Sequence, residues 1–174
     1  MKLSIFHKLL KTIHFHASLI EIYKTTKQPK IDYAITIWDY SSEDNVNKIQ
    51  RLQNRAIRAM LNNYDYINYR GVDLVASIKL LNVKQRRDYF MSLLVFKCIH
   101  GLAPDYLCNE ITMAIEVTTR NNRFVNSNDV YVPITNTECV RKSFSYKGPV
   151  VWNALPDDLK ECANLNAFKC KVRD

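Results

Sequence analysis

Glycine is scarce in this chain, with only three glycines among 174 residues. Tight turns and phosphate-binding loops depend on glycine, because it adopts positive φ without steric cost. The scarcity therefore disfavours repeated β-hairpins and any glycine-rich nucleotide loop. Hydrophobic residues make up 47% of the chain and charged residues 24%, which is ordinary for a globular protein. Helices are the expected main element.

The clearest helical pattern runs from about residue 42 to residue 61. Glu43 and Asp44, preceded by serine, suit the positive end of a helix. Apolar residues recur at helical spacing on one side: Val46, Ile49, Leu52, Ala56, Ile57 and Met60. A basic stripe occupies the other side: Lys48, Arg51, Arg55 and Arg58. We predict an amphipathic helix that buries the apolar side and turns the basic stripe to solvent.

Further helices are expected at about residues 3–24, 72–80, 84–99 and 104–115. Between Tyr89 and Ile99, apolar residues cover nearly every direction around the axis, so this helix belongs in the centre of the domain. Gly101 suits the left-handed cap that follows it. Residues 31–38 form a short apolar run that fits a helix or a strand equally well.

The sequence changes character after Val117, where Asn and Ser become frequent. Residues 129–133 and 143–146 are strand candidates, and residues 150–154 suit a helical turn around Trp152. Asn164 is placed to cap a final helix over 165–173, with three apolar side chains facing inward: Leu165, Phe168 and Val172.

The fold prediction is therefore mostly α: a helical domain with a small irregular strand-containing segment near 118–150. The corresponding division is an N-terminal helix in 1–28, a helical core in 29–117, and a C-terminal irregular segment with a final helix in 118–174.

The net charge of +8 favours a polyanionic partner, with nucleic acid first and an anionic membrane surface second. The N-terminal apolar run is interrupted by His7 and Lys8, so we expect neither a signal peptide nor a membrane-spanning helix. The five cysteines lack the spacing of a zinc site and their number is odd. We expect idle thiols in an intracellular protein that is not secreted, with no metal site and no membrane partner.

Catalytic chemistry has few candidates. Asp157 and Asp158 form an adjacent carboxylate pair of the kind that two-metal polymerases use, but acids directly after Pro156 are better explained by helix capping. Cys98 and His100 do not share a helix face, and apolar neighbours favour a buried thiol. We predict no catalytic residue in this chain.

Basic residues are the best candidates for a binding site, because several cations along one helix face can meet successive phosphates. The alternative is that these charges only solvate the helix and complement its dipole. Phe144 and Tyr146 lie among the last candidates, where bases could stack, although a core position is more usual for aromatics. The candidates are Lys48, Arg51, Arg55, Arg58, Arg86, Arg87, Arg120, Arg123, Arg141, Lys142 and Lys147.

Several segments between about residues 18 and 172 form a set of motifs in a fixed order. One is the stretch 96–107, which contains the pattern "K-x-x-x-G-L-A-P-x-Y-L". The others are 29–33 with Trp38, 47–58, 81–83 with 86–89, 131–133, 141–146, 148–149, 152–156 and 165–169. Together these motifs resemble the region after the polymerase domain in jockey-like, LINE-type (non-LTR) retrotransposon reverse transcriptases.

The resemblance implies a C-terminal fragment of an RNA-directed DNA polymerase, a thumb or tail region that contacts template RNA and primer DNA but lacks the catalytic centre. Residues 1–28 would then adjoin an upstream polymerase, usually preceded by an endonuclease, and magnesium would be needed only there. A nuclear and cytoplasmic location follows. The residues suited to this contact with template and primer are Lys48, Arg51, Arg55, Arg58, Arg86 and Arg87. The alternatives are a helical protein-interaction module and a non-functional remnant of a decayed element.

Overall fold

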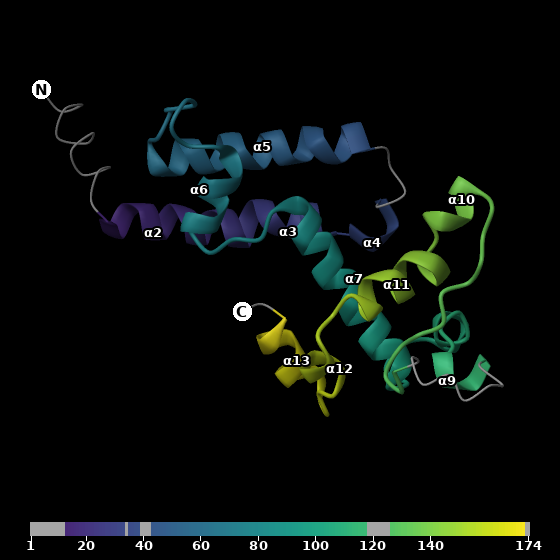
Figure 1. Cartoon of the computed structure of the whole chain (residues 1–174). Helices are drawn as coiled ribbons and strands as arrows, with labels where there is room; N and C mark the ends of the chain where they lie inside the picture. The colour runs from purple at the N-terminus through teal and green to yellow at the C-terminus, as the bar shows by residue number, and fades with distance from the viewer. Residues whose placement is uncertain (1–12, 34, 39–42, 118–125, 173–174) are drawn as a thin grey trace, which may run out of the picture. The chain divides into compact units, whose positions relative to one another are not determined.

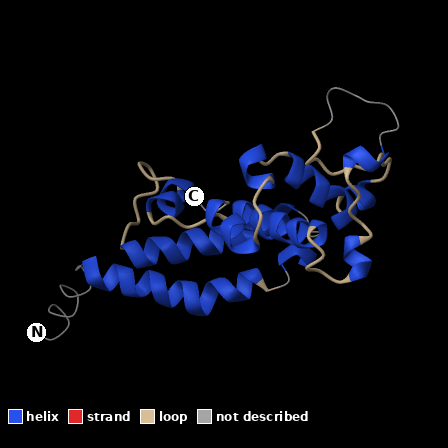
Figure 2. Ribbon diagram, turned by 90° about the horizontal axis from the view of Figure 1, so that it is seen from below, coloured by secondary structure: helices blue, strands red, loops and turns tan. Residues whose placement is uncertain are grey.

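The computed structural model describes residues 13–33, 35–38, 43–117 and 126–172, and this part of the chain is mostly helical (Figure 1). Figure 2 shows helices joined by loops and turns, with no named strand in the described residues. The prediction of a mostly α fold is confirmed. The chain forms two compact units, Met1–Arg86 and Arg87–Asp174, which divide within a helix. The division expected at residues 28 and 117 stays a prediction.

The helices of the N-terminal unit are α2 (Ile13–Ile22), the π-helix η1 (Tyr23–Lys27), α3 (Gln28–Asp32), α4 (Ile35–Trp38), α5 (Glu43–Leu61) and α6 (Gly71–Ser77). Helix α7 (Val83–Ile99) crosses the boundary between the units. The C-terminal unit contains α8 (Asp105–Cys108), α9 (Ala114–Val117), α10 (Glu138–Arg141), α11 (Phe144–Asn153), α12 (Asp157–Lys160) and α13 (Leu165–Lys171).

The N-terminal unit packs α2 and η1 against α5 and α6 (Figure 1). Its core consists of Tyr23, Ile57, Met60, Leu74, Val75 and Leu80. Burying these apolar side chains supplies the main force that holds the helices together. The predicted bounds of α5 and the start of α7 are confirmed.

The first predicted helix does not end at Lys24. Helical backbone continues through η1 and α3 to Asp32, and the expected residues 3–12 lie outside the described part of the chain. The hydroxyl of Thr26 donates to the carbonyl of Ile22 at 2.6 Å, so the threonines bond within the helix instead of ending it. Pro29 lies in the first turn of α3, directly after the π-helix η1 and within continuous helical backbone. Of the ambiguous run 31–38, residues 35–38 form the helix α4.

The C-terminal unit is built around α7, as the all-round apolar pattern predicts. Val95 and Phe96 are fully buried, and the Phe96 ring stacks on Phe168 with centroids 4.6 Å apart. Trp152 packs beside both rings and donates its indole N–H to the carbonyl of Asn128 at 2.9 Å. Asn164 caps α13 by accepting from the amide of Ala167 at 2.8 Å, as predicted.

The predicted strands are not found in the described residues. Val130 forms only an isolated antiparallel bridge with Met113. On the other side of Val130, the side-chain amide of Asn153 accepts from its N–H at 2.9 Å and donates to its carbonyl at 2.8 Å. The backbone hydrogen-bonding groups of this extended segment are therefore satisfied by the bridge and by the Asn153 side chain, without a sheet.

The second strand candidate, residues 143–146, is the start of α11. Gly148 and Pro149 lie inside this helix instead of interrupting it. A Cβ at Gly148 would come within 3.0 Å of a Val95 methyl, so glycine permits close packing on α7. The loss of one backbone hydrogen bond at Pro149 is offset by burial of the proline and of Trp152.

The helix predicted over residues 104–115 is instead two short helices, α8 and α9. Gly101 takes the predicted left-handed conformation, with φ of 66°.

Candidate nucleic-acid interface

Helix α5 presents three basic side chains to solvent: Lys48, Arg51 and Arg55. We call these residues the exposed basic face. Acidic residues of α5 are confined to its first turn, where Asp44 lies one turn before Lys48, and none lies between Lys48 and Arg55. Lys48 and Arg55 are two helical turns apart, roughly 10 Å along the axis. The face is a short row of positive charge.

Two glutamine side chains fix the rotation of α5 about its axis. Gln53 is buried and donates to the carbonyl of Leu81 at 3.1 Å. Gln50 accepts from the amide of Val83 at 2.8 Å. Because both bonds tie the inner side of α5 to the segment before α7, the opposite side is held toward solvent.

The partners of the exposed basic face are few. Lys48 donates only a long bond, 3.4 Å, to the Asn45 side chain, and within the described residues neither Arg51 nor Arg55 forms an ion pair. Leu52, expected in the core, is 62% exposed beside them, and it is not among the residues of the N-terminal core. The outward side of α5 is therefore wider than the sequence pattern indicates.

Arg58 corrects the prediction that the whole basic stripe faces solvent. It is only 5% exposed, and its guanidinium donates to the carbonyls of Asp65 at 2.9 Å and Tyr69 at 2.6 Å. Its Cζ lies 4.2 Å from the centre of the Tyr66 ring. The physical reason is the turn after α5: Asn62 has φ of 49° and sends the following loop back over the helix end.

Residues 62–70, here called the tyrosine loop, are ordered by their own polar groups. The Asp65 carboxylate accepts from the amides of Ile67 at 2.9 Å and Asn68 at 3.0 Å, and from the Asn68 side chain at 2.7 Å. Hydrogen bonds from Asn68, and then from Ile67, hold the pKa of Asp65 below its usual value. Asn63 accepts from the amide of Asp65 at 3.0 Å. The tyrosine loop thus has a defined backbone.

Arg86, like Arg58, forms a contact within the fold. Its guanidinium forms a two-pronged ion pair with Asp32, and both side chains are largely buried. Arg87, in the other unit, lies 3.9 Å from the Asp88 carboxylate and is mostly buried as well. Both guanidinium groups are largely buried and lie near carboxylates, so they are less open to a phosphate than the residues of the exposed basic face. Their contact with nucleic acid stays a prediction.

The remaining basic candidates differ in exposure and in their partners. Lys142 pairs with Glu138 at 2.8 Å, which raises the pKa of Lys142 and lowers that of Glu138. Arg141 is exposed and donates to the carbonyl of Thr135 at 3.4 Å. Lys147 is half-buried. The two others, Arg120 and Arg123, lie outside the described residues.

The two aromatic residues beside these cations differ in their packing. Phe144 packs against the C-terminal core, and Tyr146 is half-buried. Phe144 therefore takes the core position that is more usual for an aromatic residue, and its ring is not available for base stacking.

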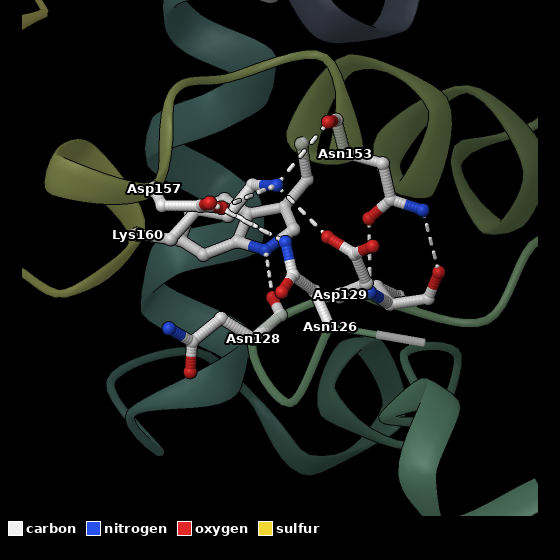
Figure 3. A network of polar contacts seen from close by, with 8 residues as sticks. Asn126, Asn128, Asp129, Asn153, Asp157 and Lys160 are labelled. Atoms are coloured by element: carbon white, nitrogen blue, oxygen red, sulfur yellow. Dashed lines mark hydrogen bonds and ion pairs between the residues drawn. The ribbon is translucent and has the colours of Figure 1, made fainter. Parts of the chain in front are cut away.

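Asp157 belongs to a structural polar cluster (Figure 3). Lys160, whose side chain is 3% exposed, lies 2.8 Å from the Asp129 carboxylate and 3.6 Å from that of Asp157. Lys160 also donates to the carbonyl of Asn153 at 3.2 Å, and Asn126 donates to Asp157 at 3.2 Å. These contacts hold the segment after residue 126 against α11 and α12. Sequence reasoning missed this buried lysine, which no local pattern marks.

The thiol and imidazole candidates have structural partners too. Burial raises the pKa of Cys98 to about 11, with a smaller contribution from Cys108. The His100 ring stacks on Phe96 and its Nδ1 lies 2.9 Å from the Phe96 carbonyl, away from any role as a base for Cys98. In the described part of the chain, no group of three or more His, Cys, Asp or Glu side chains is arranged to hold a metal ion.

No helix among the described residues combines the length and apolarity that a membrane crossing requires. Comparison with protein-family models gives no match, and neither a curated protein nor a solved structure matches the chain.

Proposed function

We propose that this chain contacts nucleic acid through the exposed basic face of α5, as the C-terminal thumb or tail region of a non-LTR retrotransposon reverse transcriptase. The observation that carries the proposal is the arrangement of Lys48, Arg51 and Arg55 on one side of a helix whose rotation is fixed from behind. The parent enzyme is named because the sequence resembles that family. In this proposal the partners are template RNA and primer DNA.

The chemistry of the face suits phosphates and not base edges. Three cations without a carboxylate partner can each neutralise one phosphate and release its counterions, which gives affinity without sequence preference. The net charge of +8 adds a long-range attraction to any polyanion. The proposed role is therefore to hold template and primer. Polymerisation, with its magnesium ions, belongs to a catalytic centre elsewhere in the parent enzyme.

A salt titration tests this proposal. Fluorescence anisotropy would follow the binding of the chain to a labelled RNA–DNA hybrid at several salt concentrations. Three phosphate contacts predict a slope of log K against log salt of about −2.7, taking about 0.9 per contact. Arg51→Gln combined with Arg55→Gln should reduce the slope by about 1.8 and weaken binding at 0.1 M salt by about fifty-fold.

A matched control removes the same charge from elsewhere in the N-terminal unit. Lys79 and Lys84 are both exposed, so Lys79→Gln combined with Lys84→Gln lowers the net charge equally without touching α5. This variant should keep most of the affinity and nearly the whole slope. Equal losses in the two double variants would show that only net charge matters, and absence of binding at low salt would contradict the proposal altogether.

A further inference from the structure

The tyrosine loop exposes a cluster of aromatic and apolar side chains. Tyr64 is 58% exposed, Tyr66 69%, Tyr69 48% and Ile67 93%. Four large, partly apolar side chains are thus exposed within six residues, a local concentration of the kind that marks contact sites. The core of the N-terminal unit does not use them.

The loop holds these rings in place before any partner arrives. Arg58 binds the carbonyls of Asp65 and Tyr69, and the Asp65 carboxylate binds the two amides between them. A backbone fixed in this way loses little conformational freedom on binding, so the contact energy of the rings is retained as affinity. Tyr66 is fixed further by the Arg58 guanidinium at 4.2 Å, and most of its surface remains open.

Charge around the loop selects the occupant. Arg70 follows the last tyrosine and is exposed, while Arg55 lies one turn from Arg58 on α5. The one acid of the loop, Asp65, is occupied by hydrogen bonds from its own backbone and from Asn68. A single nucleic-acid strand suits both the exposed arginines and the exposed rings, because it carries negative phosphates and flat bases.

We infer that the tyrosine loop stacks the bases of a single-stranded nucleic acid whose phosphates lie along the exposed basic face. The inference rests on the proposed function and adds a substrate class to it. Bases in a duplex already stack on one another and offer no free ring face, whereas bases of a single strand stack readily on aromatic side chains. The loop therefore favours unpaired template or primer over paired segments.

The test compares a labelled single-stranded RNA, the same strand in an RNA–DNA hybrid, and an abasic strand of equal length with the same phosphates. The wild-type chain should bind the abasic strand at least about tenfold more weakly than the RNA, because each stacked base contributes roughly fivefold or more and the loop offers several rings. Equal affinity for the two strands would overturn the inference, since phosphates alone would then explain binding.

Paired variants separate stacking from folding. Tyr64→Leu with Tyr66→Leu should weaken single-strand binding by about tenfold or more and leave hybrid binding unchanged. Tyr64→Phe with Tyr66→Phe keeps both rings and should bind as the wild type does. Hydrogen exchange of the loop amides, unchanged in the leucine variant, would show that Arg58 still holds the backbone.

The two proposals fail in different ways. If the leucine variant binds both ligands normally while the Arg51 and Arg55 variant loses both, stacking is overturned and the proposed function stands. If the leucine variant loses hybrid and single strand equally, the loop is not a base-stacking surface and the inference is overturned. If the wild-type chain binds neither ligand at low salt, both proposals are overturned, and the exposed tyrosines become a protein-docking surface.

Discussion

Replacing Arg58 with alanine tests the main difference between the sequence pattern and the structure. The guanidinium is almost fully buried and makes two charge-assisted hydrogen bonds to carbonyls of the tyrosine loop. Arg58→Ala removes both bonds and leaves the carbonyls of Asp65 and Tyr69 without their donor. The cation–π contact with Tyr66 is lost at the same time.

The size of the effect follows from these contacts. A hydrogen bond to a charged group contributes about 1.5–3 kcal/mol, and the lower end applies because water can reach carbonyls of a surface loop. Two such bonds give about 3 kcal/mol. The contact with the exposed Tyr66 ring adds roughly 0.5 kcal/mol. Arg58→Ala should therefore lower the free energy of unfolding of the N-terminal unit by about 3–4 kcal/mol, a large share of ordinary domain stability.

Urea denaturation followed by circular dichroism measures this loss, and hydrogen exchange of residues 62–70 locates it. Arg58→Lys keeps the charge but not the planar fork that reaches two carbonyls, so it should cost about half as much. Arg55→Ala is the matched control, because Arg55 is exposed and its removal should change stability by less than about 0.5 kcal/mol. Equal unfolding midpoints for Arg58→Ala and Arg55→Ala, with unchanged exchange in the loop, would refute the buried placement of Arg58.

Three further predictions concern buried or hydrogen-bonded ionisable groups. Lys160→Met should destabilise the C-terminal unit by about 2–3 kcal/mol, measured by urea denaturation, because it leaves the partly buried Asp129 carboxylate without its cation. Cys98 should resist iodoacetamide at pH 8 while the exposed cysteines react, since a thiol with a pKa of about 11 is ionised to roughly one part in a thousand at that pH; rapid alkylation in the folded chain would contradict this. An NMR titration should give Asp65 a pKa below 3.8. Because the folded-state pKa is lowered, this carboxylate stabilises the loop above about pH 4, and the contribution disappears as pH falls through the folded value.

Local patterns predict much of this fold correctly. The bounds of α5, the central position of α7 and the inward face of α13 all follow from apolar residues at helical spacing. The cap at Asn164 and the left-handed Gly101 follow from the preferences of single residues. These features are predictable because their causes lie within a few residues along the chain.

Features that depend on contacts distant in sequence are not predictable in this way. Asp32 and Arg86 are 54 residues apart, and Asp129 and Lys160 are 31 apart. Nothing in the periodicity of either helix marks these cations as buried. The strand candidate around Val130 fails for a similar reason, because an amide side chain on α11 satisfies its backbone in place of a neighbouring strand.

Arg58 is an intermediate case, because the loop that covers it starts only four residues later. A sequence signal existed: Asn62 favours the left-handed turn that reverses the chain, and the spacing of Asp65 and Asn68 suits a side-chain-capped turn. Read together, these residues predict a loop that folds back over the end of α5. An arginine at that end then meets carbonyls, and a helical wheel alone cannot show this.

Under the proposed function, the members of the basic stripe have separable roles, which experiments on single variants can test. Arg55 contributes charge without stabilising the fold, so its loss should alter the salt dependence of binding and leave the unfolding midpoint in place. Arg58 stabilises the tyrosine loop and is shielded from phosphates, so its loss should remove the preference for a single strand while the salt slope for the hybrid stays the same. A surface that merely solvates the helix also predicts the loss of stability in Arg58→Ala, because Arg58 is buried. It predicts no effect of Arg55 on the salt dependence of binding, so that measurement distinguishes the two readings.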